Sequence, residues 1–267
     1  MENIAEQKIA VYFDLKSTNE IALMHGLFLA KVFNRELCLL HPVKRKEDRQ
    51  GVRDVLSAES RKLMKQYPDI NFSSLIPTGS FESIQESLGG DWDVVLLIAE
   101  KSRFFTLVGG LKEANIPFLF VDNNKQVSQQ YENLILPIDF RREIKDCGIW
   151  ASYFARFVKS NILLVTAKES GDEKKRIDLN VLSIRKLFRS VGQEFLLIQS
   201  NRSSWFIQKE ATRCKVGGGK CYAFLGSRYD SFADLLIGPP EKRILKHTSE
   251  CPVLFVNPRK DMYVMCD

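Results

Sequence analysis

An internal repeat constrains this chain more than any other feature of its sequence. An apolar run that closes on an aspartate occurs at residues 9–14 and again at 134–139, an offset of 139 − 14 = 125. The same offset relates residues 28–31 to 153–156 and residues 37–40 to 162–165. Residues 9–42 and 134–167 therefore carry one pattern twice, which predicts two copies of one structural unit.

The length of the chain agrees with two domains. Its 267 residues give two halves within the usual ~100–200 residues of a domain, and each half can bury its own core. Residues 122–130 are polar, contain Asn123-Asn124 and Gln129-Gln130, and show no periodic apolar face. We interpret this stretch as a linker and predict domains at residues 1–124 and 131–267.

Short apolar runs and amphipathic patterns alternate along both halves. The runs typical of strands are residues 8–14, 36–40, 71–76, 94–98 and 116–121, then 134–138, 162–165, 194–199, 222–225 and 251–256. Helical patterns separate them, most clearly at residues 21–32, 44–67, 181–191 and 205–216. Strands that alternate with helices pair in parallel through right-handed crossovers. The sequence predicts an α/β fold of two tandem doubly wound, Rossmann-like domains with helices on both faces of each sheet.

Charge and hydropathy exclude several classes of protein. The net charge is +6 and the pI about 8.9, but the basic residues lie in separate clusters such as 44–46 and 174–176. We interpret them as solvated faces, and a nucleic-acid partner is disfavoured. No apolar run approaches the ~18 residues of a membrane helix, and the polar residues 1–8 exclude a signal peptide. We therefore predict a cytoplasmic protein with no membrane partner.

The cysteines and histidines show no metal-binding or catalytic spacing. The six cysteines include no CxxC pair, and the three histidines stand far apart with no carboxylate at ligand spacing. Reduced structural thiols are the better interpretation, and His41 is interpreted as a capping or core residue at a strand end. Trp150 and Trp205 are expected in cores or interfaces. We predict no catalytic residue, no metal site and no enzymatic activity.

Several motifs, in this order and in duplicate, resemble the universal stress protein family. They are the strand-aspartate and capped helix, the strand ending at His41-Pro42-Val43, Gly226-Ser227-Arg228 after a fourth strand, Gly238 before a helix, and the final strand at residues 251–256. The resemblance covers almost the whole chain. It implies a five-stranded parallel sheet of order 3-2-1-4-5 in each domain. It also implies a pseudo-dimer of the two halves paired through their fifth strands, because such apolar edges left open would aggregate.

The nucleotide signature of the family is altered in this chain. ATP-binding members carry Gly-x-x-Gly, nine residues, then Gly-Ser/Thr, whose glycines let backbone amides approach phosphates. The second half keeps Gly226 and Gly238, but Tyr229 replaces the second glycine, eight residues intervene, and Pro239 replaces Ser/Thr. In the first half, residues 99–103 replace the loop altogether. The resemblance therefore predicts no ATP binding in the first half and a weakened site in the second.

The resemblance also implies which residues contact a ligand. Asp14 and Asp139 occupy the strand-one position that contacts adenosine in nucleotide-binding members, at the edge where open α/β sheets bind ligands. The candidate binding residues are Asp139, Phe140, Ala167, Gly226, Ser227, Arg228 and Gly238 in the second half, and Asp14 and Val43 in the first. Two alternatives stay open. Each aspartate caps the following turn, and the arginines near Asp139, among them Arg141 and Arg142, either form an anion pocket or face solvent.

Three functions follow in order of preference. The first is a tandem universal stress protein, non-enzymatic, that binds a small ligand or a partner under stress. The second is a nucleotide-binding switch in the second domain, with ATP or another adenine nucleotide as cofactor and slow hydrolysis. The third, a nucleotidyl-transfer enzyme, lacks a phosphate loop, since residues 217–220 (Gly-Gly-Gly-Lys) do not fit the GxxxxGK[ST] frame. The sequence also leaves open a homodimer and a protein partner.

Overall fold

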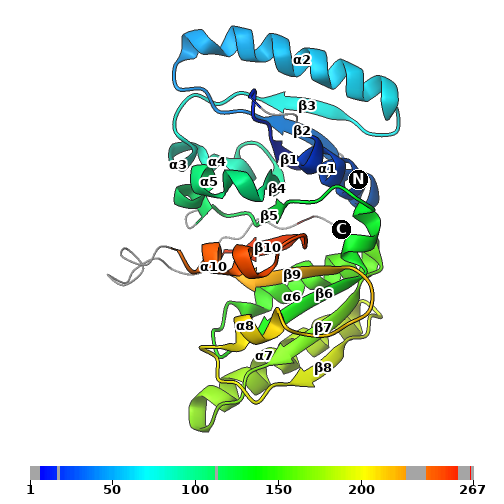
Figure 1. Cartoon of the computed structure of the whole chain (residues 1–267), viewed down its shortest axis with the longest axis vertical. Coiled ribbons are helices and arrows are strands. Elements are labelled where there is room, and N and C mark those ends of the chain that lie inside the picture. Colours follow the sequence, from blue (N-terminus) through cyan, green and yellow to red (C-terminus); the bar gives the residue numbers. More distant parts are fainter. Residues whose placement is uncertain (1–6, 17–18, 112–113, 227–238, 258–264, 266–267) are drawn as a thin grey trace. The chain divides into compact units, whose positions relative to one another are not determined.

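The computed structural model describes residues 7–16, 19–111, 114–226, 239–257 and 265, and in it the chain divides into two units (Figure 1). Unit 1 comprises Met1–Lys125 together with Arg259–Asp267, and unit 2 comprises Gln126–Pro258. The division after residue 125 falls inside the predicted linker. The segment from Arg259 onward, which the prediction gave to the second domain, groups with unit 1, and most of it lies outside the described residues.

Unit 1 is built around a parallel sheet. Its elements are β1 (Lys8–Tyr12), α1 (Glu20–Phe33), β2 (Glu36–Leu40), α2 (Arg49–Gln66), β3 (Phe72–Leu75), α3 (Phe81–Ile84), α4 (Ser87–Gly90), β4 (Val94–Glu100), α5 (Phe104–Leu111) and β5 (Phe118–Val121). The strands follow the order β3-β2-β1-β4-β5, and neighbouring strands pair in parallel. The central strands β1 and β4 are almost entirely buried, as a continuous apolar run predicts for a parallel sheet covered on both faces.

The helices of unit 1 pack closely against this sheet through small and apolar residues. Gly26 lies where α1 crosses the sheet, and a Cβ there would meet Val11 at 2.5 Å and Leu37 at 2.9 Å. The long helix α2 lies along β3 (Figure 1), so that the edge strand of this unit is covered. The sequence pattern at residues 44–67 thus predicted α2 with its start a few residues too early.

Unit 2 repeats the arrangement. Its elements are β6 (Asn133–Ile138), α6 (Ile144–Tyr153) with a π-helical turn (Phe154–Val158), β7 (Asn161–Thr166), α7 (Gly171–Ser190), β8 (Leu196–Gln199), α8 (Ile207–Ala211), β9 (Lys220–Leu225), α10 (Pro240–His247) and β10 (Val253–Val256). The strands follow the order β10-β9-β6-β7-β8, again in parallel. The predicted α/β fold with parallel sheets and helices is confirmed.

The strand registers preserve the sequence repeat. Leu97 of β4 pairs with Phe118 of β5, and Tyr222 of β9 pairs with Val253 of β10. The offset is 222 − 97 = 125 for the fourth strands but 253 − 118 = 135 for the fifth. The insertion therefore lies between the fourth and fifth strands of unit 2, as the sequence indicated.

The two units differ most around their outer strands. In unit 2 the long helix α7 packs on α6 and β6, whereas α2 of unit 1 packs on β3. The helix predicted at residues 205–216 is shorter in the structure. The short α8 ends at Ala211, and residues 212–213 form a turn. Trp150 is fully buried, as expected of a core residue, whereas Trp205 is 87% exposed, which excludes a core and leaves the predicted alternative of an interface. No helix among the described residues is long and apolar enough to span a membrane.

Candidate ligand site at the carboxyl ends of the strands

The parallel topology brings the predicted second-half residues to one edge of unit 2. Because β6 pairs with both β7 and β9, the residues that follow these strands meet at their carboxyl ends. Asp139 follows β6, Ala167 follows β7 and Gly226 follows β9. This edge is where open α/β sheets bind ligands. Ser227, Arg228 and Gly238 lie outside the described residues.

The Asp139 carboxylate is held by Arg141. The Arg141 backbone amide donates to Oδ1 at 2.8 Å, and its Nε donates to Oδ2 at 2.8 Å, with Nη2 at 2.6 Å from the same oxygen. The Arg141 Nη1 also lies 3.4 Å from the Gly226 carbonyl oxygen. Asp139 is buried and Arg141 half-buried. The arginine thus spans the edge from β6 to β9 and neutralises the carboxylate, as charge-assisted pairs of this geometry do.

A buried asparagine supports the same turn. The Asn180 side-chain amide, on α7, donates at 2.9 Å to both the Asp139 and the Arg141 carbonyl oxygens. Sequence reasoning missed this residue. The signal was present, since Asn180 stands among Ile177, Ile184 and Phe188 on the buried face of the helix. A polar amide at such a position needs hydrogen-bond partners, because burying it without them costs free energy.

The backbone donors near Asp139 are also engaged. The Gly226 amide donates to the Val256 carbonyl oxygen at 2.8 Å, and the Ala167 amide donates to the Ile138 carbonyl oxygen at 3.0 Å. Phe140 is half-buried in the turn after Asp139. Neither amide of these two loop residues is therefore available to a phosphate without breaking a sheet hydrogen bond.

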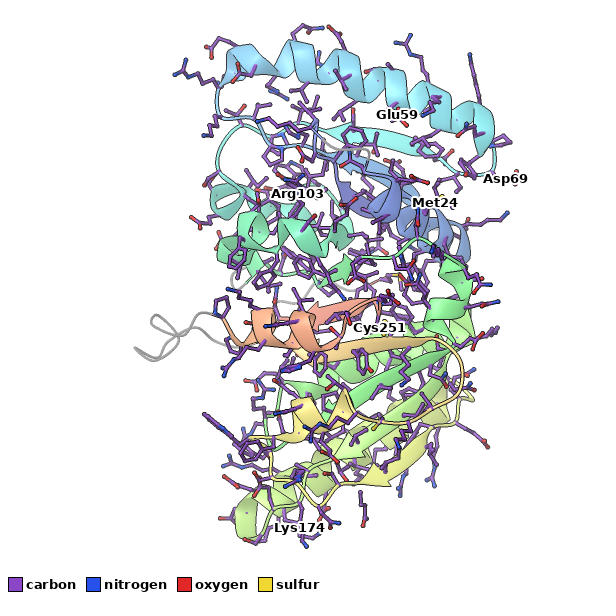
Figure 2. All side chains as sticks on the ribbon, viewed as in Figure 1. Met24, Glu59, Asp69, Arg103, Lys174 and Cys251 are labelled. Carbon is purple, nitrogen blue, oxygen red and sulfur yellow. The ribbon has the colours of Figure 1, made fainter. Side chains whose placement is uncertain are left out.

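In unit 1 the equivalent aspartate caps a turn and forms an ion pair. The Asp14 Oδ1 accepts from the Lys16 amide at 3.1 Å, which is the turn-capping geometry. The Asn19 side chain closes the same turn, accepting from the Asp14 amide and donating to its carbonyl oxygen, both at 2.7 Å. The Asp14 Oδ2 is paired with Arg103, from the turn after β4 (labelled in Figure 2).

A second ion pair lies at the carboxyl edge of unit 1. The Lys101 ammonium is 3.0 Å from the Asp122 carboxylate, with the lysine side chain 10% exposed. It joins the ends of β4 and β5, at the position where the family signature would begin. Val43 is buried, its amide donating to Pro77 and its carbonyl accepting from Gly79. His41 is structural, as expected, with Nδ1 at 2.7 Å from the Phe13 carbonyl oxygen.

The ionisable groups whose pKa departs most from its usual value are buried in the cores of the two units. No group of three or more His, Cys, Asp or Glu that could hold a metal ion occurs there. Burial lowers the pKa of His25 to about 4 and raises the pKa of Cys38 to about 12. Burial also raises the pKa of the Cys147 thiol. The buried thiols are therefore protonated at neutral pH and poor nucleophiles.

The described cavity lies elsewhere in unit 2. A hollow of about 370 Å³ opens beside β8, against the end of β7 and the turn around α8. Its lining residues are Val165, Ile198, Gln199, Ser200, Asn201, Arg202, Glu210 and Cys214. None of the predicted site residues lines it. The hollow and the Asp139 turn therefore have no lining residue in common.

Comparison by sequence finds no match: no protein-family model and no curated protein matches this chain. Solved structures do match. A universal stress protein from Archaeoglobus fulgidus DSM 4304 superposes with a TM-score of 0.68 at 14% identity, covering 97% of this chain and 100% of that chain. A putative universal stress protein from Pseudomonas aeruginosa UCBPP-PA14 gives 0.58 at 15% identity, covering 95% and 94%.

The same fold also occurs in a different setting. The cytoplasmic domain of a prokaryotic cation chloride cotransporter superposes with a TM-score of 0.53 at 11% identity, covering 97% of this chain and 98% of that chain. These likenesses define the class of architecture, a tandem α/β fold. In particular, the chain has the fold of the tandem universal stress proteins. At such identities the likeness concerns the fold alone, since one fold hosts many functions.

Proposed function

We propose that this chain is a non-enzymatic binding protein of the universal stress protein type, which acts in a stress response by engaging a partner or a small ligand. The observation that carries the proposal is that both aspartates are ion-paired with arginines of their own unit. Asp139 is neutralised by Arg141, and Asp14 is paired with Arg103. In both units the carboxylate that the family resemblance assigns to adenosine therefore already has a cationic partner from its own chain.

The backbone around these aspartates supports the same conclusion. A phosphate-binding loop works by pointing free amides at the anion. Here the Gly226 amide is bonded to β10 and the Ala167 amide to β6.

The alternative is a nucleotide-binding switch in unit 2, in which ATP or another adenine nucleotide displaces Arg141 from Asp139. It keeps Gly226 and Gly238 as phosphate contacts. The two functions predict different nucleotide affinities. In the switch, breaking the ion pair between Asp139 and Arg141 costs free energy that nucleotide binding must offset.

Isothermal titration calorimetry with Mg-ATP, ADP and AMP distinguishes the two. We expect no saturable heat from the wild-type protein, and no phosphate release from ATP above background. The Asp139→Ala variant tests the site, and Arg142→Ala is the matched control, since Arg142 is exposed in the same turn. Binding by the wild type that Asp139→Ala abolishes and Arg142→Ala preserves would reject the proposal in favour of the switch.

A further inference from the structure

The outer strand of unit 2 is exposed in a way that its counterpart in unit 1 is not. β8 stands at the end of the strand order, with Leu196 59% exposed and Leu197 and Ile198 half-buried. By register Leu196 pairs with Leu163, as Ser73 of β3 pairs with Cys38, and 163 − 38 = 125. Unit 1 thus has a serine where unit 2 has a leucine.

The two outer strands, β3 and β8, also differ in how the neighbouring long helix packs. The long helix α2 lies along β3 (Figure 1), whereas α7 packs mainly on α6 and β6 and meets the start of β8 through the rings of Phe188 and Phe195. An apolar edge strand that is neither covered nor charged is a template for pairing with another strand. β8 is therefore more apolar and more exposed than β3, the outer strand of unit 1.

The loop that follows β8 extends the apolar surface. Trp205 is 87% and Phe206 54% exposed. This loop is held in place, because the Ser204 amide donates to the Glu169 carboxylate at 2.6 Å and the Lys168 amide donates to the Arg202 carbonyl oxygen at 2.8 Å. Exposed aromatic residues on a fixed loop, beside a hollow of about 370 Å³, are features of an interaction surface.

The charges around β8 indicate what pairs with it. Glu194 precedes the strand and Arg202 follows it, and both are exposed. The Arg202 Nε lies 4.0 Å from the Glu210 carboxylate, a long and weak ion pair. An acid at one end and a base at the other are complementary to the same strand in antiparallel orientation. A twofold axis brings identical surfaces together in that way.

We propose that β8 pairs antiparallel with β8 of a second copy of this chain. With the twofold axis at Leu197, Leu196 faces Ile198 of the partner subunit. Leu196 of the partner subunit then covers Ile198, one of the residues that line the hollow. Each Glu194 lies diagonally across from Arg202 of the partner subunit, a spacing at which long charged side chains interact.

The test is the oligomeric state of the full chain by sedimentation equilibrium over a range of concentrations. We expect the wild-type mass to approach twice the chain mass of 30.6 kDa, and Leu196→Asp to reduce it to one chain. Leu179→Asp is the matched control, because Leu179 is 61% exposed on α7 and away from β8. It should remain dimeric, and circular dichroism should show that both variants fold.

Charge-reversal variants distinguish a specific interface from nonspecific hydrophobic association. Glu194→Arg and Arg202→Glu should each raise the dimer dissociation constant roughly tenfold, and the double reversal should restore it. A wild-type monomer at every concentration, or a dimer insensitive to Leu196→Asp, would overturn the proposal.

Discussion

The buried histidine of unit 1 gives the fold a calculable pH dependence. His25 is fully buried in α1, and its Nε2 lies 2.7 Å from the Asn123 carbonyl oxygen. Burial, the largest cause, lowers the pKa of His25 from 6.5 to about 4, although the Asn123 carbonyl and the nearby Asp122 favour the charged form. The ring is therefore neutral at pH 7 and donates its Nε2–H to Asn123.

The magnitude follows from the two pKa values. Because the pKa is lower in the folded state, the unfolded chain binds more protons between pH 6.5 and about 4. The contribution of His25 to stability is complete above pH 6.5 and is lost as the pH falls to about 4. A pKa lower by 6.5 − 4 = 2.5 corresponds to about 3 kcal/mol of unfolding free energy.

Urea unfolding of the wild type and His25→Gln measures this contribution. Glutamine can still donate to Asn123 but does not titrate. We expect the wild type to lose stability relative to the variant by about 2.5 kcal/mol between pH 7 and pH 4.5, since the carboxylates titrate in both proteins and cancel. Parallel stability curves would refute the reasoning, as would a His25 ring proton signal that titrates near pH 6.5 in the folded protein.

Packing and hydrogen bonding give the remaining predictions. Gly26→Ala, which would place a methyl 2.5 Å from Val11 and 2.9 Å from Leu37, should cost about 1–3 kcal/mol in thermal or urea unfolding; a neutral result would show that the helix shifts freely. Gly51→Ala on α2 meets nothing within 4 Å and should stabilise by about 0.5–1 kcal/mol, which makes it the matched control. Asn180→Ala removes two hydrogen bonds to buried carbonyls and should cost about 1–3 kcal/mol; a loss under 0.5 kcal/mol would mean that water replaces the amide.

The sequence predicted where the two aspartates of the candidate site lie, but not which side chains they pair with. Apolar runs that end on Asp14 and Asp139 placed both carboxylates at the carboxyl edges of parallel strands, because the topology allows no other location. The family resemblance then assigned them to a ligand. Which partner each carboxylate takes depended on distances between loops. Arg141 and Arg103 are two of 39 basic residues, and nothing in the sequence distinguishes them from arginines that face solvent.

The same division applies to the surface. The sequence placed Trp205 in a core or an interface, because large aromatic residues are usually buried, but it could not decide between the two. Trp205 lies in the turn just before α8, and α8 is positioned by β6, β7 and α10, which are far from it in the chain. Asn180 shows the converse, since its place on an apolar helix face was visible in the sequence but its two carbonyl partners were not.

By itself, the sequence determined the repeat, the alternation of strands and helices, and hence the tandem α/β architecture. These depend on periodicity and on hydrophobic burial, which are properties of short segments and act locally. Only the tertiary structure decided that the aspartates are engaged, that His25 is neutral and that β8 is exposed. Each of these depends on a few ångströms between side chains that are distant in sequence, and electrostatic and packing energies change steeply over such distances.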